Sequence, residues 1–115
     1  MKLVDYCDRV GEANKNWWID IHTGDFIKRN VGEMLMLVTS ELSEALEGDR
    51  KSLMDDKLPQ YKMFDVEIVD AIIRLFDIAA HLIDDIDAIF EAKMEYNKTR
   101  VDHSIEHRKL NGKKY

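Results

Sequence analysis

The apolar positions of this chain recur with the 3.6-residue period of amphipathic helices, not with the two-residue alternation of strands. Polar turn residues separate the helical segments and are expected to form loops. The pattern predicts four main helices and a short fifth one in the tail. They are expected at about residues 2–17, 30–48, 64–82 and 84–100, and before Asn111-Gly112.

The second predicted helix has the clearest boundaries. Asn30 is a favourable N-cap, and Glu33 stands three residues later, in the capping-box position. Gly48 follows the last apolar residue and is predicted to be the C′ residue that ends the helix. Residues 49–61 contain Pro59 and are interpreted as a loop.

The third predicted helix is apolar around most of its circumference. A helix of this kind is central in a bundle or buried between subunits. We therefore expect an all-α fold, a compact four- to five-helix bundle completed by oligomerisation, with a single domain over residues 1–115.

The composition favours a globular protein and argues against several kinds of partner. Hydrophobic residues make up 45% of the 115 positions and charged residues 35%, which is not typical of disorder. The net charge of −6 argues against binding to duplex nucleic acid through its phosphates. Cys7 is the single cysteine, and no apolar run approaches the roughly 20 residues that cross a bilayer. We expect a cytoplasmic protein without membrane partners.

Two acidic pairs interrupt the most apolar helices. Glu41 and Glu44 lie in the second, and Glu67 and Asp70 in the third, each pair spaced i, i+3 and so on one helix face. Four carboxylates brought together would repel each other unless a cation neutralised them. Ligands that are all oxygen favour Mg²⁺, with Mn²⁺ as a substitute.

Other interpretations of these acids stay open. Acidic pairs on helices are often solvated faces, and the protein would then be a non-catalytic helical interaction module. A di-iron site needs Glu-x-x-His pairs, and a zinc site needs a Cys/His cluster. The four histidines do not supply the first, and one cysteine does not favour the second.

The order of these motifs resembles the MazG-like all-α nucleotide pyrophosphohydrolases. That family carries ExxE and ExxD on two antiparallel helices, followed by a helix with Lys, Asn and Arg. The acidic pairs match the first two motifs, and the resemblance covers about residues 30–101. The positions that match the later helix are Lys93, Asn97 and Arg100.

The resemblance implies a Mg²⁺-dependent enzyme that hydrolyses (deoxy)nucleoside triphosphates to a monophosphate and pyrophosphate, in nucleotide-pool housecleaning. Glu41, Glu44, Glu67 and Asp70 would hold the metal and act in catalysis, with Glu44 as the candidate that orients the attacking water. The basic helix would bind the nucleotide phosphates. A homodimer or homotetramer is implied, and a related phosphohydrolase with another nucleotide substrate remains the alternative.

Base recognition has a weaker basis in the sequence. Trp17 and Trp18 are candidates for stacking on a nucleobase, because an aromatic face stacks on any base. Adjacent residues of a helix point about 100° apart, so the two are not expected to share one role. The alternative for either residue is an anchor that fixes the first helix to the core.

Overall fold

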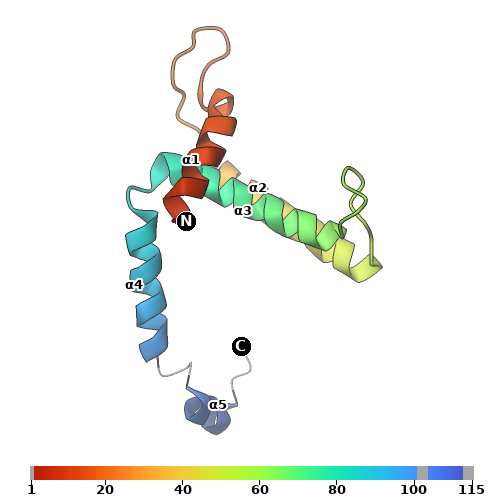
Figure 1. Cartoon of the computed structure of the whole chain (residues 1–115), viewed down its shortest axis with the longest axis vertical. Coiled ribbons are helices and arrows are strands. Elements are labelled where there is room, and N and C mark those ends of the chain that lie inside the picture. The colour runs from red at the N-terminus through yellow and green to blue at the C-terminus, as the bar shows by residue number, and fades with distance from the viewer. Residues whose placement is uncertain (1, 101–103, 113–115) are drawn as a thin grey trace.

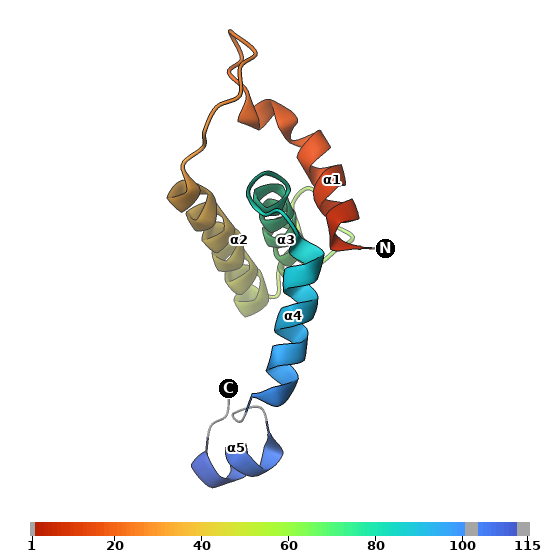
Figure 2. The ribbon, with the colours of Figure 1, turned by 90° about the vertical axis from the view of Figure 1, so that its left-hand side faces the viewer.

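A computed structural model describes residues 2–100 and 104–112 and confirms the all-α class. Within these residues there is no β-strand, and only two isolated bridges, Ile19 with Phe26 and Met54 with Lys62, have β geometry. Figures 1 and 2 show the first helix, the pair of long central helices and the fourth helix extending in different directions from one region, with the last helix beyond the far end of the fourth. The elements are α1 (Leu3–Ala13), a 3₁₀ helix (Lys15–Trp18), α2 (Val31–Lys51), α3 (Met63–Leu82), α4 (Ile86–Thr99) and α5 (Ile105–Asn111).

An antiparallel pair of long helices, α2 and α3, forms the centre of the fold (Figure 1). Asn30 caps α2 as predicted, and its side chain accepts a hydrogen bond from the Glu33 amide at 3.0 Å. The predicted end at Gly48 is wrong, because α2 continues to Lys51. Gly48 is instead where α3 approaches: a Cβ here would lie 2.8 Å from the Cβ of Met63.

The first helix packs across α3 and ends earlier than predicted. Cys7 is buried in this contact, and the ring of Tyr6 stacks on Phe76 with 5.7 Å between centroids. The chain leaves the α-helix at Asn14 and continues as a 3₁₀ helix. The N-terminus of α1 is closed by Asp87 of α4, whose carboxylate accepts from the amides of Leu3 and Val4 at 2.9 and 3.1 Å.

The expected compactness is wrong for the single chain, because α4 leaves the α2–α3 pair after its contact with α1 (Figure 2). Asp85 caps α4 by accepting from the Ala88 amide at 3.1 Å. The radius of gyration is 18.1 Å, against about 13 Å for a compact domain of 100 residues. The predicted short helix in the tail is present as α5, and it ends at Gly112 with a positive φ of 67°.

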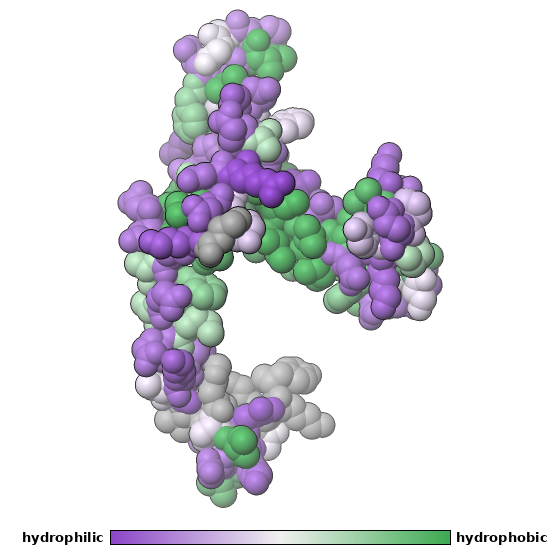
Figure 3. Space-filling model, viewed as in Figure 1, coloured by the Kyte–Doolittle hydropathy of each residue, from purple (hydrophilic) through white to green (hydrophobic). Residues whose placement is uncertain are grey.

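This open shape leaves large apolar side chains in contact with solvent on α2, α3 and α4. Figure 3 shows them gathered along the helix pair and on α4. None of the described helices combines the length and apolar character needed to cross a bilayer. Examples with 47% exposure or more are Leu35, Leu46, Val69, Leu75, Ile89, Phe90 and Met94.

Candidate functional site

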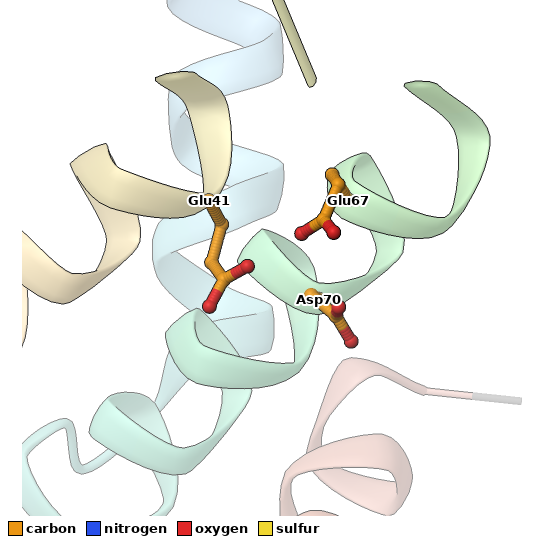
Figure 4. Close-up of side chains that lie close together, drawn as sticks. All are labelled: Glu41, Glu67 and Asp70. Carbon is orange, nitrogen blue, oxygen red and sulfur yellow. The ribbon is translucent and has the colours of Figure 1, made fainter. Parts of the chain in front are cut away.

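Three of the four predicted carboxylates meet between α2 and α3. Glu41 extends from α2 toward Glu67 and Asp70, which lie one turn apart on α3 (Figure 4). One carboxylate oxygen of each residue lies within 4.8 Å of the others, and all three side chains are half-buried. Glu44 is exposed and is not a member of this cluster.

The three carboxylates perturb one another in the way expected of close like charges. The hydrogen bond with Glu41, then burial and the nearby acids, raise the pKa of Glu67 to about 7. Burial, followed by the charges of Glu41 and Asp55, raises the pKa of Asp70. Burial also acts upward on Glu41, but hydrogen bonds with Glu67 and Arg74 hold its pKa below the usual range.

This donor set fits a hard divalent cation. The hydrogen bond with Glu41 raises the pKa of Glu67, and burial raises the pKa of Asp70. The available donors are all carboxylate oxygens, and their like charges repel. A cation between them would remove that repulsion, and oxygen ligands select Mg²⁺ or Mn²⁺ over Zn²⁺. Glu44 adds to the negative charge at Glu67 without joining the cluster.

A pocket of about 710 Å³ opens beside the cluster and reaches the first loop of the chain. Glu41 and Asp70 line it near the cluster, and Arg74 lines it as well. Its other polar or aromatic lining comes from Asn14, Trp17, Arg29, Glu33 and Asp77, and its apolar lining from Met34, Leu37, Ile73 and Ile78.

The two tryptophans have different surroundings. Trp17 is 71% exposed and lines the pocket, whereas Trp18 is 2% exposed. The Trp18 indole nitrogen donates to both carboxylate oxygens of Asp77 at 3.2 Å, and its ring stacks on His81 with 3.9 Å between centroids. Trp18 therefore acts as an anchor to the core, which was the alternative to base stacking. Trp17 remains the candidate for base stacking.

A buried charge cluster holds the loop before α2 against α3. Asp77 is 6% exposed and faces Arg29 at 3.9 Å and the ring nitrogen Nδ1 of His81 at 3.5 Å. The Arg29 guanidinium also lies 5.3 Å from the centroid of the Trp18 ring. Arg29 thereby reaches the pocket from a loop in which nothing in the sequence indicated a functional residue.

The three predicted phosphate-binding residues lie on or next to α4, away from the acidic cluster of the same chain (Figure 1). The Lys93 ammonium lies 4.9 Å from the centroid of the Tyr96 ring. The Oδ1 atom of Asn97 is buried and, within residues 2–100 and 104–112, has no hydrogen-bond partner. Arg100 is the C-cap residue of α4.

Two further residues near the cluster make contacts that the sequence analysis did not identify. Arg74 has the i, i+4 spacing to pair with Asp70, but its Nε donates to Glu41 of the neighbouring helix at 2.9 Å. Asp55 lies in the predicted loop yet is only 6% exposed, and it accepts from the amides of Lys57 and Leu58. The spacing of residues along one helix cannot predict either the Arg74–Glu41 hydrogen bond or the burial of Asp55.

Fold and site together define an all-helical protein with an acidic cluster beside a pocket that contains two arginines. No protein-family model, curated protein or solved structure matches the chain. Membership of the MazG-like family therefore stays a prediction from the motifs.

Proposed function

We propose that the protein is a Mg²⁺-dependent nucleoside triphosphate pyrophosphohydrolase that acts on the nucleotide pool in the cytoplasm. The main support is the meeting of Glu41, Glu67 and Asp70, with oxygen atoms within 4.8 Å of one another, beside a pocket that Arg29 and Arg74 line. The motif order that resembles the MazG-like family supplies the reaction class. Cleavage would occur between the α- and β-phosphates.

The chain's own residues would divide the work as follows. Glu41, Glu67 and Asp70 would hold the metal, which neutralises phosphate charge and lowers the pKa of water when bound. Glu44, exposed on the next turn of α2, would orient or deprotonate the attacking water. This role suits Glu44 because its charge acts on Glu67, yet it is not one of the three residues that would hold the metal.

The two ends of the pocket would determine the orientation of the bound nucleotide. Its acidic end would take the triphosphate together with the metal, and the end formed by Asn14, Trp17 and Arg29 would take the sugar and base. Trp17 suits stacking because 71% of its surface is open. Trp18 and Asp77 would fix the wall behind it through their buried hydrogen bonds.

We propose that a second copy of the chain completes this site, in a homodimer or a homotetramer. The exposed apolar side chains on α2, α3 and α4 need covering, and α4 extends away from the helix pair that carries the acidic cluster (Figure 1). An α4 from a second copy would bring Lys93, Asn97 and Arg100 to the phosphates.

The direct test of the activity is incubation with ribo- and deoxyribonucleoside triphosphates, with Mg²⁺ and with EDTA, followed by anion-exchange chromatography. Monophosphate and pyrophosphate that disappear with EDTA are the expected products. Release of inorganic phosphate would favour the related phosphohydrolase. No turnover with Mg²⁺ or Mn²⁺ would favour the helical interaction module, for which the exposed apolar faces are the supporting observation.

Subunit mixing tests the shared site. Glu41→Gln and Lys93→Ala damage opposite halves of it, so each variant alone should be inactive. In a twofold dimer, random mixing of the two should restore up to about a quarter of the wild-type activity, because half the dimers then contain one intact site of two. No recovery in a mixture shown to exchange subunits would place both residues in the site of one chain.

A further inference from the structure

Arg74 is placed where it contacts both the acidic cluster and the pocket. It lies one turn after Asp70 on α3, and its Nε atom donates to Oε1 of Glu41 at 2.9 Å. Its side chain is 41% exposed, whereas that of Glu41 is only 16% exposed. The guanidinium therefore bonds inward to a half-buried carboxylate while part of the side chain faces the pocket.

The pairing gives Arg74 a specific electrostatic role in the metal-free protein. Three carboxylates lie together, and Asp55 adds further negative charge at Asp70. Arg74 forms an ion pair with one member of this cluster, Glu41. It supplies one positive charge at a site where a divalent cation would supply two.

The same pairing conflicts with a bound metal. A divalent cation on Glu41 would lie close to the guanidinium, and the two like charges would repel. Arg74 has a long, flexible stem and five N–H donors in a fork that matches phosphate oxygens. The open part of its side chain faces the pocket that would hold those oxygens.

We propose that Arg74 is a phosphate-binding residue that exchanges partners during the reaction. It neutralises Glu41 while the site is empty and transfers its hydrogen bonds to the triphosphate when Mg²⁺ and nucleotide enter. This inference rests on the proposed function, because it requires both a metal and a phosphate in the pocket. Arg74 thereby keeps the acidic cluster stable between turnovers and adds a positive charge to the pocket when the substrate is present.

The test compares Arg74→Gln and Arg74→Lys with Arg50→Gln, a control that removes one positive charge from an exposed position of α2. Calorimetry with MgCl₂ and no nucleotide measures metal binding separately from catalysis. Removing a competing cation should tighten Mg²⁺ binding by about tenfold in Arg74→Gln. The KM for the triphosphate should rise by at least about tenfold, because a charge-assisted hydrogen bond is lost. Arg74→Lys should fall between Arg74→Gln and the wild type, and Arg50→Gln should behave as the wild type.

The outcomes separate this inference from the proposed function. If the wild type binds Mg²⁺ and hydrolyses triphosphates but Arg74→Gln has an unchanged KM, the inference fails and the function stands. Weaker Mg²⁺ binding in Arg74→Gln would also overturn it, since Arg74 would then orient Glu41 for the metal. A wild type that neither binds Mg²⁺ nor turns over any triphosphate overturns both.

Discussion

Replacing Glu67 by glutamine tests the repulsion within the acidic cluster. Glutamine has nearly the same shape, and its amide nitrogen can donate to Glu41 as a protonated carboxyl group would. It differs in that it never ionises. The substitution therefore removes one titration from the cluster while keeping the packing and the hydrogen bond between α2 and α3.

The expected magnitude follows from the pKa of Glu67. The hydrogen bond with Glu41, burial and the neighbouring acids raise this pKa to about 7, against an ordinary value of 4.5. Between these two pH values the folded protein keeps a proton that the unfolded chain has lost, so stability falls as the pH rises. This contribution is fully present below pH 4.5 and is lost as the pH passes 7. At about 1.4 kcal/mol per pKa unit, and allowing for the partial exposure of Glu67, the loss is about 1–3 kcal/mol.

The assay is urea unfolding in EDTA at about pH 5 and about pH 8, at one protein concentration. The free energy of unfolding of Glu67→Gln, relative to the wild type, should rise by about 1–3 kcal/mol between the two pH values. The control Glu91→Gln changes an exposed glutamate of α4 and should shift stability by under about 0.5 kcal/mol at both. Parallel pH dependences for the wild type and Glu67→Gln would refute the reasoning.

Three further substitutions test other parts of the structure. Saturating MgCl₂ should raise the melting temperature of the wild type in a thermal-shift assay, and Asp70→Asn should abolish that rise because a metal ligand is lost. An undiminished rise would remove Asp70 from the metal site. Trp18→Ala should lower the free energy of unfolding by about 3–5 kcal/mol in urea titrations. Trp17→Ala should change it by under about 0.5 kcal/mol and raise the KM for nucleotides, so equal losses of stability would contradict the different surroundings of the two rings. Gly48→Ala should cost about 1–3 kcal/mol by the same titrations, since its Cβ would lie 2.8 Å from the Cβ of Met63; a gain of stability, as helix propensity alone predicts, would show that the helices adjust easily.

The helices themselves could be predicted because their signals are local. The apolar period and the Asn30 cap gave the start of α2, and the periodicity gave α3 to within one residue at its start. The end of α2 was predicted wrongly at Gly48 because glycine also occurs where two helices pack closely. The need for a residue without a Cβ comes from Met63 of α3 and not from the sequence neighbours of Gly48. The separation of α4 from the helix pair was not predictable, because apolar periodicity does not say whether a face is covered by the same chain or by another.

The acidic cluster was predictable in part for a geometric reason. Residues three apart on a helix differ by about 60° around its axis, so a crossing helix need not reach both equally. On α3 both Glu67 and Asp70 reach the cluster, but on α2 only Glu41 does and Glu44 stays exposed. Arg74 shows the same limit, because the carboxylate that accepts its hydrogen bond belongs to Glu41 of α2 and not to Asp70 at the favourable i, i+4 spacing.

If a second copy completes the site as proposed, the acidic cluster and the basic helix should depend on assembly in different ways. The acidic cluster lies within one α2–α3 pair, so metal binding should persist in a variant that cannot oligomerise. Over the described residues, α4 extends away from the α2–α3 pair of its own chain (Figure 1), so nucleotide turnover should depend on assembly. A charged substitution at Ile89, which is 59% exposed on α4, would separate these two properties. A monomeric Ile89→Glu variant that binds Mg²⁺ and remains fully active would show that one chain suffices, and α4 would then have to fold back onto its own helix pair.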